Sequence, residues 1–537
     1  MLDSARTKHH PATTSGLQPR AGGSKFDAAR LISGEVHSQP TGGGSVAAER
    51  TAELPGTEPS LLAGSVSPLA TLFQSITFMA PAGAIVFSLS IAVPLAGNAL
   101  PISILIAGIA CILTAVAIGQ LASEVPSAGG LYSYAATGLG PKWGFAVGWL
   151  YVGVALFFPP FVFLVFGWFI ETTLKSEHLP TPAWWVWSMV CVALTFALTY
   201  FGVRLSTNSG IILGSFELLI FGALSVTMIA HGPNSTAAFS TSGHSTSGLF
   251  QGAVFGILAF TGFEVASTLG EEARNPRRTV KYSIVFAALL VGAYFVFCSY
   301  AWVVGAKFDI VNNLKTSGGN PWNLFGHRYW GAGWVLVFLA ILNSIIANGV
   351  ASVNNAGRVL LAMGRAGAAP SVFARVHTKY RTPSTSIIVV LAVSVLVTLL
   401  AGWKFGIDVA WGVTATIFTV FAILIYMICC LACISFFTQK EGRSRLKPWL
   451  HVAVPAGGLL VFVLPLYAQY FDLGELFSGK FKLTVTYPFN WADYGALIWI
   501  GIGALLTVVL ARRRPEALSQ AGRAFAGATE SDGVPAK

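Results

Sequence analysis

The stretch that decides the fold is residues 69–94, LATLFQSITFMAPAGAIVFSLSIAVP. It carries no charge and is longer than the ~20 apolar residues that a helix needs to cross a bilayer. Pro81 and Gly83 interrupt it, because proline removes a backbone donor and clashes with the preceding turn, and glycine loosens a helix. In lipid, such a break is tolerated only where the freed backbone groups face protein or a water-filled cavity. The stretch therefore predicts a discontinuous membrane helix beside such a cavity.

A second apolar stretch is broken in the same way. Residues 259–264 read AFTGFE, with Gly262 inside the apolar run and Glu264 after it. Taken singly, either break could be a kink in a packed helix. The two breaks are five predicted spans apart, and an odd number of spans inverts the second unit relative to the first. Matched broken helices in two inverted halves are typical of a transporter site.

The composition excludes a soluble globular protein. Of 537 residues, 54% are hydrophobic and 10% are charged, whereas soluble domains carry about 25% charged residues. We predict an all-α membrane domain over 66–514, between disordered tails at 1–65 and 515–537 that lack apolar periodicity. About twelve spans of membrane length are expected, at 69–94, 100–122, 143–170, 183–203, 208–230, 249–270, 280–304, 331–354, 384–403, 406–436, 451–471 and 491–511.

Basic residues are distributed unevenly between the two predicted sides of the membrane. With the N-terminus inside, 26 of the 33 Lys and Arg residues fall on the cytoplasmic side and 7 on the outer side. This bias follows the positive-inside rule and predicts that both tails are cytoplasmic. Topology and contact with anionic lipid therefore explain the net charge of +11, and no nucleic acid is expected as a partner. We expect a multi-pass protein of the plasma membrane and leave open whether it forms a homo-oligomer.

The six cysteines indicate neither disulfides nor a metal site. All of them lie inside predicted spans, and no histidine or carboxylate is near Cys429, Cys430 and Cys433 in the sequence. Disulfides normally staple exposed loops in oxidising compartments. Packing in the core is the expected role, and no metal or other cofactor is predicted.

Three motifs resemble the amino acid–polyamine–organocation superfamily of permeases, of the amino acid permease type. Residues 262–279 contain GFE followed by GEEARNPRRT, residues 126–134 read PSAGGLYSY, and residues 357–365 read GRVLLAMGR. The resemblance implies a five-plus-five inverted repeat like that of the bacterial leucine transporter, with helices 1 and 6 discontinuous. Repeat one would cover about 69–230 and repeat two about 249–436, followed by two extra helices over about 451–511. It also implies alternating access around a site between helices 1 and 6.

The two breaks supply the candidate substrate site. At the first break, Ala80 and Pro81 precede the amides of Ala82, Gly83 and Ala84, which we expect to be free to bind a carboxylate at a positive helix end. At the second, carbonyls near Phe260 and Thr261 could accept hydrogen bonds from an ammonium group. Side-chain selection would fall to Phe260, Thr261 and Phe263 beside Gly262. The family's arginine/agmatine antiporter differs at several of these positions, which argues against arginine and agmatine.

Glu264 is the candidate proton carrier, because ionisable groups inside membrane spans are rare and usually mark ion pathways. One antiporter of the family has a glutamate at the matching position, which implies a role in protonation and in the inner gate. The alternative is a structural hydrogen bond. Glu217 is the second intramembrane acid and the second candidate. A cytoplasmic gate of ion pairs is predicted from the acids Glu271 and Glu272 and the bases Arg274, Arg277 and Arg278. The alternative is a solvated loop whose basic residues only follow the positive-inside rule.

The sequence therefore predicts a secondary active transporter, proton-coupled, for a small amino acid, amine or polyamine. The alternative is a nutrient-sensing receptor with the permease fold and little transport. A membrane-embedded enzyme is disfavoured, because no histidine lies inside a predicted span beside an acid.

Overall fold

The computed structural model describes residues 66–513 except 126–128, 202–206, 271–272, 366–368, 381, 440–441, 477–482 and 484–486. The described residues all belong to one unit of the chain. The predicted tails lie outside them, as do Glu271 and Glu272 of the predicted gate.

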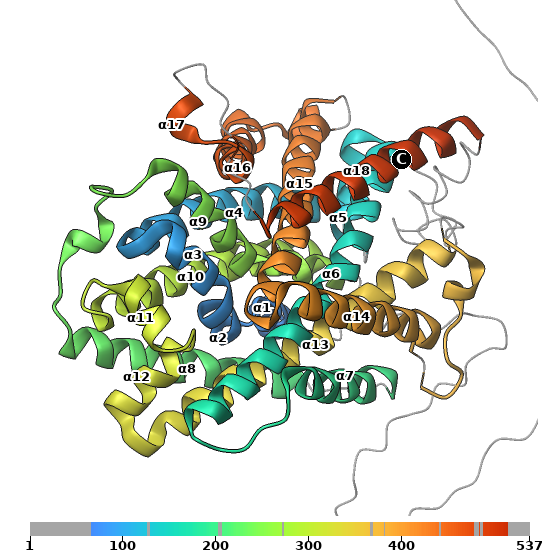
Figure 1. Ribbon diagram of the computed structural model, residues 1–537. Helices are drawn as coiled ribbons and strands as arrows, with labels where there is room; N and C mark the ends of the chain where they lie inside the picture. Colours follow the sequence, from blue (N-terminus) through green and yellow to red (C-terminus); the bar gives the residue numbers. More distant parts are fainter. Residues whose placement is uncertain are drawn as a thin grey trace, which may run out of the picture. The chain divides into compact units, whose positions relative to one another are not determined.

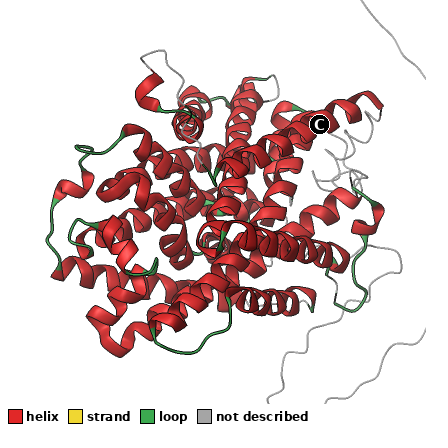
Figure 2. Ribbon diagram, viewed as in Figure 1, coloured by secondary structure: helices red, strands yellow, loops and turns green. Residues whose placement is uncertain are grey.

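Helices account for nearly all of this part of the chain, and Figure 2 shows no strand in it. The longer helices and the segments of the first break are α1 (Pro68–Met79), α2 (Pro81–Gly83), α3 (Leu89–Ala96), α4 (Leu100–Glu124), α6 (Pro141–Ser176), α7 (Trp184–Tyr200), α8 (Thr207–His231), α9 (Thr246–Phe260), α10 (Pro276–Gly305), α13 (Trp334–Arg365), α14 (Ser384–Phe405), α15 (Ile407–Thr438), α16 (Val454–Tyr470) and α18 (Asn490–Arg513). Shorter helices in the connections are α5 (Gly130–Leu139), α11 (Ile310–Thr316), α12 (Pro321–Trp330) and α17 (Leu473–Leu476).

Each of the twelve predicted spans coincides with a helix or a broken helix (Figure 1). Among the described residues, ten helical segments are long and apolar enough to cross a membrane, and the first of them, Pro68–Glu124, contains two predicted spans. The remaining span is α7, which is shorter but also apolar. The predicted fold class is confirmed.

The contacts between helices repeat in the way that two related halves require. Helix 1 packs against helix 7 (α1 with α10), and helix 6 packs against helix 2 (α9 with α4). Likewise, helix 3 packs against helix 10 (α6 with α15), and helix 8 packs against helix 5 (α13 with α8). In each set, the second contact joins the counterparts, in the other predicted repeat, of the helices in the first. The two broken helices also contact each other, because α1 packs against the helical turns at Phe263–Leu269 that follow α9.

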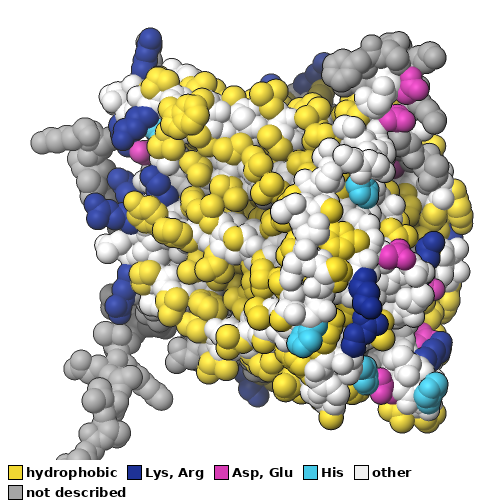
Figure 3. All heavy atoms as spheres, turned by 90° about the vertical axis from the view of Figure 1, so that its left-hand side faces the viewer, with side chains coloured by type: hydrophobic (Ala, Val, Ile, Leu, Met, Phe, Trp, Pro, Cys, Tyr) yellow, Lys and Arg dark blue, Asp and Glu magenta, His cyan; other side chains and the backbone are white. Residues whose placement is uncertain are grey.

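Apolar side chains cover the outside of the described helices. On α8, Ile212, Leu219 and Val226 are spaced seven residues apart and are 67%, 71% and 59% exposed. In water this stripe would be costly, but hydrocarbon accepts it. Figure 3 shows hydrophobic side chains over the middle of one face, with many Lys and Arg along one edge and histidine, acidic and further Lys and Arg side chains towards the other. This banding is that of a multi-pass integral membrane protein.

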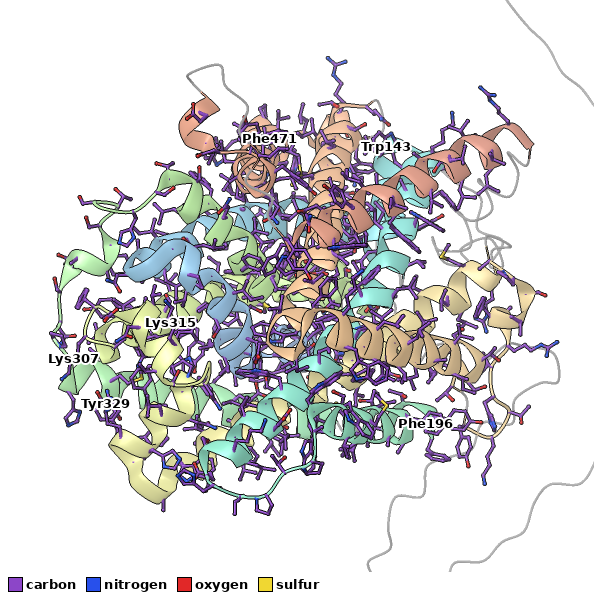
Figure 4. The ribbon with its side chains drawn as sticks, in the orientation of Figure 1. Trp143, Phe196, Lys307, Lys315, Tyr329 and Phe471 are labelled. Carbon is purple, nitrogen blue, oxygen red and sulfur yellow. The ribbon has the colours of Figure 1, made fainter. Side chains whose placement is uncertain are left out.

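The connection between α10 and α13 lies on one flank of the described helices. In Figure 4, its residues Lys307, Lys315 and Tyr329 lie together on one side of the view, whereas Trp143 and Phe196 lie on the opposite side. This connection is the one predicted to lie on the outer side of the membrane.

Candidate functional site

Helix 1 breaks at Ala80. Ala80 adopts a left-handed conformation, with φ +45° and ψ +68°, and its N–H donates to the Thr77 carbonyl at 3.1 Å. Pro81 cannot continue the helix because it has no N–H, but its fixed φ suits the first position of a new one. The chain therefore restarts as α2, continues as a π-helical stretch, η1 (Ala84–Ser88), and then as α3. π-helical turns are rare and frequent at functional sites.

Helix 6 breaks at Gly262, between α9 and a 3₁₀ helix, η4 (Phe263–Leu269). Gly262 has φ +113°, and a Cβ built on it would lie 2.3 Å from Cδ1 of Phe78. Only glycine fits this backbone and this close approach. Because Phe78 precedes the first break by two residues, the two breaks are in direct contact.

Ser75 joins the two broken helices. Its hydroxyl donates to the Phe263 carbonyl at 2.8 Å and accepts from the Ala266 N–H at 3.1 Å. The α1 segment is thereby tied to η4 by two buried hydrogen bonds. Our sequence analysis missed Ser75, although a hydroxyl in an apolar run about one turn before a break is a detectable signal.

Two small cavities lie beside the breaks. The first has about 30 Å³ of free volume and the second about 20 Å³. Each holds about one water molecule, so a larger solute needs the surrounding helices to move apart. The first is lined by Phe78, Met79, Gly83, Ala84, Phe87, Ser88, Phe158, Phe161, Val162, Val165, Leu258, Thr261, Ser344, Ile345 and Asn348. The second is lined by Phe78, Tyr151, Val154, Phe158, Thr261, Glu264, Asn355, Ala422, Ile425 and Tyr426.

The predicted substrate residues divide into two groups. Gly83, Ala84 and Thr261 line the first cavity, and Thr261 also lines the second. Phe260, which was predicted to face the solute, lines neither cavity, because its ring packs into spaces left by glycines of α4 and α10. Phe263 also lines neither cavity, and its ring centroid lies 5.1 Å from that of Tyr426.

Four predicted substrate residues are buried and shape the breaks without lining either cavity, namely Ala80, Pro81, Ala82 and Gly262. These residues contribute to the site by setting the course of the backbone at the two breaks. Besides the broken helices themselves, α6 and α13 line the first cavity, and the sequence did not single out these two helices.

The amides that follow the first break are not free, contrary to the prediction. The Ala82 N–H donates to Oε2 of Glu217 at 3.4 Å, and the Gly83 N–H donates to Oγ of Ser344 at 2.9 Å. The Ala84 N–H donates to the Ala80 carbonyl at 2.8 Å. Side chains from α8 and α13 therefore take the positions that a solute carboxylate would use.

Glu217 is buried, with 2% of its surface exposed. Besides the Ala82 amide, its carboxylate accepts a hydrogen bond from Nδ2 of Asn343 at 2.5 Å and interacts with the Ser344 hydroxyl. Glu217 thus connects helix 1 after its break to α8 and α13. A buried carboxylate needs donors of this kind to be stable away from water.

Glu264 is also buried, as expected for an acid in a membrane span, and it lines the second cavity. Its Oε2 accepts hydrogen bonds from the Gly262 N–H at 3.0 Å and from the Tyr426 hydroxyl at 2.8 Å. The carboxylate therefore links the backbone at the second break, through Gly262, to α15, through Tyr426. Tyr426 is a site residue that sequence reasoning missed.

The basic members of the predicted gate, Arg274, Arg277 and Arg278, are exposed at the start of α10. Their predicted acidic partners lie outside the described residues. The structure instead records a backbone contact here, in which the Arg274 N–H donates to the Val66 carbonyl at 3.1 Å. This contact ties the segment before α1 to the connection after η4.

Comparison with known proteins places this geometry in a family. The family profile described as amino acid permease matches residues 71–512. The low-affinity putrescine importer PlaP of Escherichia coli strain K12 is 28% identical over 301 residues, 54% of this chain and 64% of the relative. The branched-chain amino acid permease BcaP of Bacillus subtilis is 25% identical over 319 residues, with the same two shares.

A methylthioribose transporter of Bacillus subtilis is 26% identical over 324 residues, 56% of this chain and 67% of the relative. The matches to PlaP and BcaP span slightly less than two thirds of those relatives' lengths. These relatives are permeases and transporters by name and not enzymes. The profile covers both breaks, both buried glutamates and all twelve spans almost to their ends, which confirms the resemblance found in the motifs. The chain belongs to the amino acid permease family.

Proposed function

We propose that this protein is a secondary active transporter that carries a small amino acid, amine or polyamine by alternating access, with protons as the coupling ion. Family membership and the names of the relatives, which cover putrescine, branched-chain amino acids and methylthioribose, support solute transport. None of these names favours the receptor alternative. We further propose that it resides in the plasma membrane with both termini in the cytoplasm, on the basis of the positive-inside bias.

The observation that carries this proposal is the direct contact of two broken helices in the centre of an apolar bundle. Phe78 of one break lies against Gly262 of the other, and two cavities lie beside this contact. A backbone break costs hydrogen bonds that lipid cannot replace. Such breaks are expected where the two halves of a helix move separately around a bound solute.

In this proposal, Glu264 couples the two breaks to protons. In its charged form, the carboxylate accepts hydrogen bonds from Gly262 and Tyr426, and charge-assisted bonds of this kind are about twice as strong as neutral ones. Protonation weakens both bonds and releases η4 from α15. Because Ser75 ties α1 to η4, the two segments then move together. Release of the proton restores the bonds and returns the segments.

Glu217 is the second candidate carrier in this scheme. It fastens the other half of helix 1 to α8 and α13, on the far side of the break from Ser75. The two carboxylates thus hold different halves of the broken helices, so that protonation of each would free a different segment.

The test is uptake of labelled amino acids and amines into proteoliposomes under an imposed pH gradient, normalised to folded protein. Glu264→Gln keeps the size of the side chain but cannot ionise. It should bind solute and fail to accumulate it, and its uptake should lose most of its dependence on pH. Glu171→Gln is the matched control, because Glu171 pairs with the exposed Lys175 away from both cavities.

Two outcomes contradict the proposal. Accumulation by Glu264→Gln equal to that of the unaltered protein excludes Glu264 as the carrier and makes Glu217→Gln the next variant. Binding of solutes without any accumulation by the unaltered protein favours the nutrient receptor.

A further inference from the structure

The carboxylate of Glu217 occupies the space in which a solute carboxylate would otherwise bind. It lies against the first turn of the helical segment that runs from Pro81 through η1 to Ala96, and accepts the Ala82 N–H. Ser344, which interacts with Glu217, accepts the next N–H, that of Gly83. No donor of this turn is left for a solute, whether Glu217 is charged or neutral.

A second carboxylate in this place would also meet a like charge. A solute carboxylate would need the Ala82 and Gly83 amides as donors. These amides already lie within hydrogen-bond distance of Glu217 and of its partner Ser344, respectively. Like charges placed together at a buried site oppose binding strongly, because little water is present to screen them. No positive charge in the described lining offsets this repulsion, since none of the described residues that line the first cavity is a lysine, arginine or histidine.

The same cavity is suited to a positively charged group. Four phenylalanines line it, namely Phe78, Phe87, Phe158 and Phe161, and the faces of aromatic rings attract ammonium groups. Oδ1 of Asn348, another lining residue, is buried and has no hydrogen-bond partner in the described part of the chain. A buried acceptor of this kind requires a donor, and an ammonium N–H supplies one.

We propose that Glu217 is a specificity-determining residue that replaces the solute carboxylate, so that the transported solute is an amine cation without a carboxylate. The inference rests on the proposed transport function and narrows its solute class. Glu217 acts by filling the donor positions at the first break and by repelling acids. Asn348 and the four phenylalanines then receive the ammonium group.

The experiment compares pairs of compounds that differ only in the α-carboxylate. Suitable pairs are leucine with 3-methylbutylamine, phenylalanine with phenethylamine, and ornithine with putrescine. Binding of each compound to the purified full-length protein is measured by thermal shift and by competition, together with uptake into proteoliposomes. In every pair that binds, the amine should bind at least about tenfold more tightly than the amino acid.

The variants test whether Glu217 causes this preference. Glu217→Ala frees the Ala82 amide and removes the charge, so the preference for the amine should fall about tenfold or more. Glu217→Gln keeps the space filled without the charge and should give an intermediate preference. Ser344→Ala frees the Gly83 amide and keeps the Glu217 carboxylate, although it removes the hydroxyl that interacts with it. It should raise amino acid affinity, which provides a test even if Glu217→Ala does not fold. Glu171→Ala is the control and should leave every ratio unchanged.

The outcomes separate this inference from the function on which it rests. Uptake of amino acids with equal or higher affinity than their amines overturns the role of Glu217 but leaves transport standing. An unchanged ratio in folded Glu217→Ala and in Ser344→Ala also overturns it. Absence of binding and uptake for all six compounds overturns the inference and the proposed solute class together.

Discussion

The substitution Gly262→Ala is the most stringent test of the contact between the two breaks. The Gly262 φ of +113° lies in the region that side chains with a Cβ avoid, and that conformation costs roughly 1–2 kcal/mol for an L-residue. The new Cβ would lie 2.3 Å from Cδ1 of Phe78 and 3.2 Å from the Phe78 carbonyl carbon. Rotation of the ring relieves only the first contact, because the second is to backbone.

Forced overpacking of a well-packed interior costs about 1–3 kcal/mol. Together with the conformational cost, Gly262→Ala should lower the free energy of unfolding by about 2–5 kcal/mol. Typical domains have only about 5–15 kcal/mol in total, so the variant should be visibly unstable. Transport should fall as well, because the alanine separates the two breaks.

The assay is equilibrium unfolding in mixed micelles titrated with dodecyl sulfate, followed by tryptophan fluorescence. Gly501→Ala in α18 is the matched control: its Cβ meets no atom within 4 Å, and the change should be neutral or stabilising. Adding Phe78→Ala to Gly262→Ala should recover about 1–3 kcal/mol relative to the sum of the single changes, since the ring contact disappears. A Gly262→Ala protein within about 0.5 kcal/mol of the unaltered one would refute the contact between the breaks.

Three further predictions concern the same elements. Gly83→Val should weaken solute binding about tenfold or more. A Cβ at this position would already lie 3.2 Å from Oγ of Ser344, and the added methyl groups would reach into the first cavity. Unchanged affinity in a thermal-shift assay would remove this segment from the site. Ser75→Ala should lower the free energy of unfolding by about 1–3 kcal/mol, since it leaves buried backbone groups unpaired, and equal stability would mean that Ser75 does not bridge the broken helices. Cysteines introduced at the exposed positions Ser242 and Lys379 should react with an impermeant reagent from outside and from the cytoplasm, respectively; the opposite pattern would invert the proposed topology.

The acidic residues show how far sequence reasoning reaches. A glutamate in an apolar run is conspicuous, and both Glu264 and Glu217 are buried as their positions predict. What each one contacts was not predictable. Tyr426 lies 162 residues from Glu264, and Asn343 lies 126 residues from Glu217. No local pattern specifies which of many polar side chains on other helices will meet a given carboxylate.

The sequence by itself determined the features that depend on local chemistry. A proline lacks the N–H that a helix interior needs, and a glycine adopts a positive φ, so the breaks near Pro81 and at Gly262 were readable from single residues. The spans were readable because only long apolar helices satisfy their backbone groups within a bilayer. The inverted arrangement followed from the number of spans between the breaks.

Only the tertiary structure decided what occupies the break. The Ala82 and Gly83 amides were expected to be free because a new helix begins there, but Glu217 and Ser344 reach them from 135 and 261 residues away. Likewise, the ring of Phe260 turned towards α4 and α10 because glycines there leave room for it. Such outcomes depend on side-chain packing between helices that are distant in sequence, and a buried donor takes whichever acceptor that packing brings to it.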